Sequence, residues 1–142
     1  MDGYSDTLFG LEYLRLARDF LQAFRDLPQR PPPLSWPRYL MLCHAVELLL
    51  KAFLLHRGTK LEELKKYPIR HSLVELMRWA QDQGLKLDAE VTRDIELLSE
   101  AHEAFWHRYP RKEAKPVYVI EQFEATADAL FKVVEKSFHA SA

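Results

Sequence analysis

The segment from residue 40 to residue 55, LMLCHAVELLLKAFLL, constrains the fold more than any other part of the chain, because it is apolar on almost every side. Only His44, Glu47 and Lys51 interrupt it, and at ~100° per residue these three fall within about 60° of one another. A helix that is hydrophobic all round belongs in the centre of a helical domain. Its ionisable groups must then be paired or must line a cleft. The segment therefore predicts a central helix with one polar stripe.

Length and composition restrict the class of protein. A chain of 142 residues predicts one domain over residues 1–142, with a disordered tail at 139–142. The net charge of −1 confines any nucleic-acid contact to a local patch. Cys43 is the only cysteine, so an internal disulfide is impossible. The first residues lack a signal-peptide pattern, and the apolar segment is too short and too polar for a membrane span of ~20 residues. These features predict a soluble, cytoplasmic protein without a membrane contact.

Helical periodicity runs through almost the whole chain, and strand patterning is absent. Helices are expected over residues 6–27, 35–57, 72–83, from 88 to just before Pro110, and from just after Pro116 to about 138. A short helix is expected within 59–68. Short connections place successive helices side by side. The pattern predicts an all-α, antiparallel, up-and-down four-helix bundle core with an additional short helix.

Caps and core lines follow from the same pattern. Ser35, Ser72 and Asp88 are expected N-caps, and Thr59 with Glu62 has capping-box spacing. Gly58 and Gly84 are expected to end helices. The residues predicted to face the core are, in chain order, Phe9, Tyr13, Leu16, Phe20 and Phe24; Leu73, Leu76, Met77 and Ala80; Val91, Ile95, Leu98, His102 and Phe105; and Ile120, Phe123, Ala127, Leu130 and Val134.

The polar stripe has two interpretations. Glu47 and Lys51 are an i,i+4 pair in the favourable order, so the stripe could satisfy itself or anchor a subunit contact. Alternatively it lines a polar cleft together with His71 and His102, where Glu47 and Lys51 would orient a base or a phosphate. A metal site built from His44, Glu47, Glu103 and His107 does not fit the Glu-x-x-His spacing of di-metal bundles, so no metal or other cofactor is expected.

The segment from Trp106 to Tyr118 is the better candidate for contact with RNA or a nucleotide. It interleaves aromatic and basic side chains, and the candidate phosphate-binding residues are Arg108, Tyr109, Arg111, Lys112 and Lys115. Arginine binds phosphate bidentately, and aromatic rings stack on bases without demanding a sequence. The alternative is an ordinary solvated loop, in which Glu113 dilutes the positive charge.

Three motifs in order support a family resemblance. The helix segment AVELLLKAFLLHRG (45–58), the capped HSL (71–73) and the RYP at 108–110 together resemble the HEPN superfamily of helical nucleotide- and RNA-associated domains. The resemblance covers about residues 6–138. It implies a homodimer and a nucleotidyltransferase-like partner in a toxin–antitoxin or other defence setting.

The resemblance also bears on catalysis. HEPN ribonucleases carry an Arg followed, after four to six residues, by a His, and Arg108 stands at the corresponding place. Glu113, Ala114 and Lys115 occupy the positions where that His would fall, so the usual acid–base group is missing. Arg38 and His44, near the start of the second helix, have the same separation. Six residues along a helix place them about 120° off a shared face, so we interpret this match as chance.

The sequence therefore leaves three functions open. The preferred one is a non-catalytic binding or interaction module. A divergent, metal-independent ribonuclease would use Arg108 with His107 or His71 as base. A purely structural dimeric bundle would need no ligand.

Overall fold

The computed structural model describes residues 2–27, 36–66, 72–106 and 120–140, and every regular element within them is a helix. Side chains are described for residues 7–27, 37–66, 72–100, 102 and 122–139. The six helices are α1 (Asp2–Asp26), α2 (Trp36–His56), α3 (Leu61–Leu64), α4 (Leu73–Asp82), α5 (Ala89–Trp106) and α6 (Ile120–Ala140). The all-α prediction is confirmed. α6 includes the first two residues of the expected tail.

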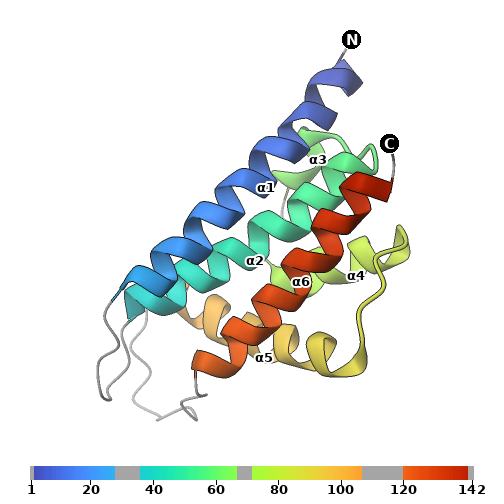
Figure 1. The fold of residues 1–142 in the computed structure, drawn as a ribbon. Coiled ribbons are helices and arrows are strands. Elements are labelled where there is room, and N and C mark those ends of the chain that lie inside the picture. The colour runs from blue at the N-terminus through green and yellow to red at the C-terminus, as the bar shows by residue number, and fades with distance from the viewer. Residues whose placement is uncertain (1, 28–35, 67–71, 107–119, 141–142) are drawn as a thin grey trace.

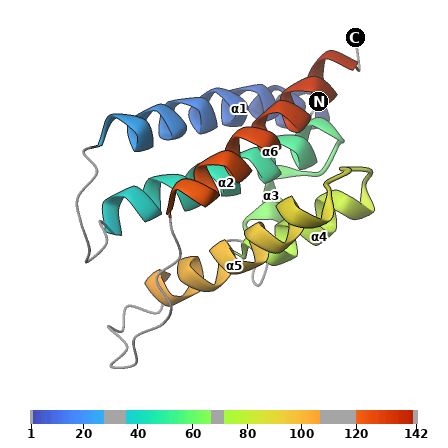
Figure 2. The same ribbon diagram turned by 60° about the horizontal axis from the view of Figure 1, so that its bottom comes forward.

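Helix α2 lies at the centre of the molecule, as its composition predicts. It contacts α1, α4, α5 and α6, and all its residues from Ala45 to Leu55 are buried. Figure 2 shows α2 between α1 and α6 on one side and α4 and α5 on the other. Within the described residues α2 is the one helix long and apolar enough to cross a membrane, but 78% of that window is buried. Its apolar surface is covered by other helices, as in the core of a soluble protein.

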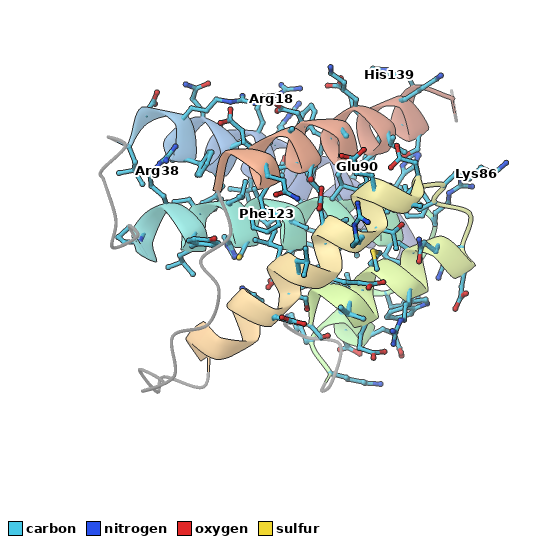
Figure 3. The ribbon with its side chains drawn as sticks, turned by 90° about the horizontal axis from the view of Figure 1, so that it is seen from below. Arg18, Arg38, Lys86, Glu90, Phe123 and His139 are labelled. Atoms are coloured by element: carbon cyan, nitrogen blue, oxygen red, sulfur yellow. The ribbon has the colours of Figure 1, made fainter. Side chains whose placement is uncertain are left out.

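The helices around α2 differ in direction. α1 runs antiparallel to α2, because Phe24 contacts Arg38 near one end and Gly10 lies against His56 at the other. α6 runs parallel to α2, with Tyr39 beside Phe123 near their starts and His56 stacked on Phe138 near their ends. The neighbouring helices α2 and α6 therefore run in the same direction, whereas the sequence predicted that neighbouring helices are antiparallel. Figure 1 shows α1, α2 and α6 side by side, and Phe123 is labelled in Figure 3.

Local signals explain several helix ends. The Ser72 hydroxyl accepts from the Glu75 backbone N–H at 3.2 Å, and the Asp88 carboxylate accepts from that of Val91 at 2.9 Å, as expected of N-caps. Gly58 and Gly84 follow α2 and α4 with φ of 101° and 106°, a conformation that favours glycine.

Two expectations about helix ends are corrected. Thr59 does not cap the short helix: α3 begins after Lys60, with no side-chain cap. The Thr59 hydroxyl instead accepts a hydrogen bond from Gln83 at 3.1 Å, because Thr59 is buried beside the end of α4. The first helix begins at Asp2 rather than Asp6. The expected cap Ser35 lies outside the described residues.

The core lines of three helices are largely confirmed. The predicted α4 residues are all buried, as are the first four of α5 and the last four of α6. Phe105 and Ile120 have side chains outside the described set.

The predicted core face of α1 is wrong for two of its five members, and two more reach the core only in part. Phe9 and Leu16 are 42% and 43% exposed, and Tyr13 and Phe20 are only half-buried. The buried line lies about 80° further round the helix and consists of Gly10, Leu14, Ala17, Leu21 and Phe24. The reason is packing distance. A Cβ on Gly10 would lie 3.2 Å from the Ala52 carbonyl oxygen, so α1 approaches α2 through a residue without a side chain.

Candidate functional site

Two members of the polar stripe of α2, Glu47 and Lys51, form a buried ion-pair network with α5. The i,i+4 spacing places Lys51 one turn after Glu47, and its Nζ donates to Glu47 Oε2 at 3.0 Å. The other carboxylate oxygen, Oε1, lies 3.3 Å from His102 Nε2. The three residues are 3%, 9% and 2% exposed, so protein encloses the network almost completely. One carboxylate thus joins the central helix to α5.

The environment keeps Glu47 ionised. Burial by itself would raise the pKa of this carboxyl, but the hydrogen bond from His102 and the Lys51 ammonium outweigh it and lower the pKa to about 2. The charge in turn affects two neighbours. Burial, and then the Glu47 charge, raise the pKa of the Tyr13 phenol and of the Cys43 thiol. Cys43 is therefore a protonated, buried thiol, which suits a structural role better than a reactive one.

The other expected members of the polar site lie elsewhere or outside the described residues. His44 is half-buried and points at α1, with its ring edge-on to Phe20 at a centroid distance of 4.5 Å. His71 lies outside the described residues. The structure thus brings together Glu47, Lys51 and His102, and it separates His44 from them.

The Arg38–His44 pair, which resembled the ribonuclease spacing, serves the contact between α1 and α2. Arg38 is 4% exposed, its guanidinium lies 4.3 Å from the centroid of the Phe24 ring, and its Nε donates to the Phe24 carbonyl at 3.4 Å. His44 contacts Phe20, one turn earlier on α1. A structural role accounts for both side chains.

A second buried network escaped the sequence analysis. Asp94 of α5 is 3% exposed and accepts two hydrogen bonds from α6, one from Gln122 and one from Thr126, each at 2.9 Å. Gln122 and Thr126 share a helix face through their i,i+4 spacing. The same spacing occurs on solvent-exposed helix faces, so it does not predict a buried network. Only the packing of α5 on α6 shows that Asp94 is buried.

One buried hydroxyl stands apart from both networks. Ser99 precedes His102 by one turn of α5 and is 2% exposed. Among the described residues, no group is placed to hydrogen-bond with its Oγ. Leaving a buried hydroxyl unpaired costs free energy.

The residues expected to bind phosphate are not described. Arg108, Tyr109, Arg111, Lys112 and Lys115 all lie in the segment 107–119 between α5 and α6. His107 lies there as well, and the Glu103 side chain is outside the described set, so only His44 and Glu47 of the hypothetical metal set are described. Within the described residues no cluster of three or more His, Cys, Asp or Glu could hold a metal ion.

Comparison with protein-family models, curated proteins and solved structures finds no match for this chain. The resemblance to the HEPN superfamily therefore rests on the sequence motifs alone.

Proposed function

We propose that this protein is a non-catalytic, HEPN-like module that binds RNA or a nucleotide through the segment from Arg108 to Lys115. One observation carries the proposal. Glu47 and Lys51 of the central helix are enclosed in a network with His102 of α5, where their partners are other side chains of the fold. They stabilise the helices and are poorly placed to meet a ligand. The basic and aromatic segment that follows α5 is then the part of the chain best suited to phosphate and bases.

The sequence lacks the histidine that follows the arginine in the motif of HEPN ribonucleases, and this supports a non-catalytic function. General acid–base cleavage of RNA needs a group that exchanges a proton near neutral pH within reach of the reacting hydroxyl. Glu47 is held ionised, with a pKa of about 2, and it is buried. The ribonuclease alternative would therefore depend on His107 or His71 acting with Arg108.

Thermal unfolding tests the binding function directly. A ligand at ~100 times its dissociation constant adds about 2.7 kcal/mol of stability, which is a few degrees for a domain of this size. We expect short single-stranded RNAs or nucleotides to raise the melting temperature of the parent protein. The double variant Arg108→Ala/Arg111→Ala should lose that shift while unfolding at nearly the parent temperature without ligand.

A matched control removes two other positive charges. Lys86 and Lys132 are exposed and lie outside the proposed segment, so Lys86→Ala/Lys132→Ala should keep the ligand-induced shift. Equal shifts in the parent and the Arg108/Arg111 variant would refute the proposed site. Cleavage of labelled RNA in the presence of a chelator, lost in Arg108→Ala, would instead establish the ribonuclease.

The proposal includes the assembly implied by the resemblance. It comprises a cytoplasmic homodimer with a four-helix bundle core, paired with a nucleotidyltransferase-like protein in a toxin–antitoxin or other defence system. Sedimentation of the purified protein tests the homodimer, and reconstitution with a nucleotidyltransferase encoded beside it tests the pairing. A monomer at all concentrations would remove the dimer from the proposal without affecting RNA binding.

A further inference from the structure

The large hydrophobic side chains that the described part of the protein exposes all lie on α1. They are Leu8, Phe9, Leu11 and Leu16, each between 39% and 50% exposed. Exposed apolar side chains scattered singly are ordinary, but Phe9 and Leu16 lie within about 20° of each other around the helix, and a contiguous apolar patch is typical of an interaction surface. α1 therefore presents more apolar surface than the fold uses.

A regular line runs through this surface. Phe9, Tyr13, Leu16 and Phe20 follow one another at steps of four, three and four, which is the a/d spacing of a coiled coil. We call these four residues the α1 seam. Phe9 and Leu16 are exposed, and Tyr13 and Phe20 are half-buried, so the seam is shared between the core and the surface.

Two other sides of α1 face neighbouring helices. The buried line through Gly10 and Ala17 faces α2. Arg18 pairs with Glu135, and Arg25 pairs with Glu124 and Asp128, so a further side of the helix faces α6. Figure 3 shows Arg18 at the surface where α1 and α6 lie side by side. The seam occupies the flank of α1 away from these ion pairs.

The charge along the seam identifies the kind of partner. Glu12, Asp19 and Asp26 are all exposed and stand seven residues apart, so they form one acidic edge beside the seam at the heptad position g. The opposite edge, position e, is uncharged, because Gly10, Ala17 and Phe24 occupy it. Charges at e and g set partner choice in coiled coils. A second antiparallel copy would bring acidic edge against acidic edge, which is unfavourable.

We propose that the α1 seam binds an amphipathic helix of a partner protein, whose apolar a/d line is flanked by Lys or Arg that face Glu12, Asp19 and Asp26. The apolar line would cover Phe9 and Leu16. The basic flank would neutralise the acidic edge. The seam does not include residues 108–115 of the proposed function, and it concerns a different partner, a basic amphipathic helix.

Two synthetic helices test the proposal. Both carry Leu at every a and d position of four heptads, and they differ only in having Lys or Glu at the flanking e and g positions. Binding to the full-length protein is measured by fluorescence anisotropy at low and high salt. We expect the Lys helix to bind at least about tenfold more tightly than the Glu helix, because three exposed ion pairs each contribute modestly. Salt should reduce the difference.

Variants of α1 locate the binding surface. The triple change Glu12→Lys/Asp19→Lys/Asp26→Lys should reverse the preference between the two helices. Leu16→Glu should abolish binding of both. Leu11→Glu is a matched control, because Leu11 is 39% exposed against 43% for Leu16 but lies about 140° away around the helix. It should bind as the parent does.

Three results would overturn the proposal: equal affinity for the two helices, unchanged binding by Leu16→Glu, or a parent homodimer that Leu16→Glu converts to a monomer. The last would show that a second copy fills the seam. The RNA-induced thermal shift, measured on the same variants, should be unaffected by Leu16→Glu. Failure of the seam and failure of the RNA site are thereby distinguished.

Discussion

His102 Nε2 of α5 lies 3.3 Å from Glu47 Oε1 at the centre of the molecule, while the other oxygen of the same carboxylate accepts from Lys51. This buried anion therefore contacts a partner on its own helix and another on a helix 55 residues later in the chain. The contact links a local i,i+4 pair to the tertiary packing of α5 on α2. It also makes the stability of the fold sensitive to Glu47.

Glu47→Ala should destabilise the protein by about 3–5 kcal/mol, because it leaves Lys51 as an uncompensated buried charge. Chemical denaturation followed by circular dichroism measures this loss. The double variant Glu47→Leu/Lys51→Met replaces the pair with apolar groups and should recover much of the stability. Glu12→Ala is the control: it breaks an exposed pair with Arg15, so its effect should stay within about 0.5 kcal/mol. A similar small effect for Glu47→Ala would contradict the buried network.

Acid should remove the stabilisation that Glu47 provides. Its folded pKa of about 2 lies below the ordinary value of 4.5, so the unfolded state takes up the proton first as the pH falls. The contribution of Glu47 is complete above about pH 4.5 and is lost between that pH and about 2. In Glu47→Gln this part of the pH dependence should be absent. The test is to measure the denaturation midpoint of the parent protein and of Glu47→Gln from pH 7 to pH 2. If the two midpoints fall in parallel as the pH is lowered, the pKa of Glu47 is not lowered in the folded state.

Gly10→Val should weaken the contact between α1 and α2 by about 1–3 kcal/mol, as overpacking does. Even the first carbon of a side chain would lie 3.2 Å from backbone atoms of Ala52 and His56, which cannot rotate away. Gly10→Ala should cost less, because the better helix propensity of alanine, about 1 kcal/mol, offsets the crowding. Thermal unfolding of both variants tests this order. Leu11→Val, at an exposed position of the same helix, controls for the β-branched side chain.

The two buried polar groups of α5 should respond in opposite directions. Asp94→Ala removes the acceptor of two hydrogen bonds from α6 and should cost about 2–4 kcal/mol, since Thr126 is buried with it. Ser99→Ala removes a hydroxyl with no hydrogen-bond partner among the described residues, so it should be neutral or stabilising. Urea titration of the two variants gives both values. A large loss in Ser99→Ala would mean that its hydroxyl has a partner.

Much of the fold could be predicted from local patterns. Capping by Ser72 and Asp88 and termination at Gly58 and Gly84 depend on a few consecutive residues, and the structure has them where expected. Thr59 shows the limit of such signals. Its spacing to Glu62 matches a capping box, yet burial beside α4 gives its hydroxyl a different partner, Gln83.

The candidate site was only partly predictable. The Glu47–Lys51 pair follows from helix spacing, but the contact with His102 depends on how α5 crosses α2. Asp94 gave no signal, because an acidic residue in an amphipathic helix usually faces water. The function proposed for residues 108–115 stays a prediction from sequence.

The sequence by itself determined that the chain is helical, where most helices end, and that residues 40–55 form the central one, because propensity, capping and composition act within a few turns. The tertiary structure decided which flank of α1 is buried. Bulky residues make one stripe of that helix the more hydrophobic, but helix–helix distance depends on the smallest residues at the contact. Gly10 and Ala17 allow α1 to approach α2 closely, and Phe9 and Leu16 of the bulky stripe are consequently left at the surface.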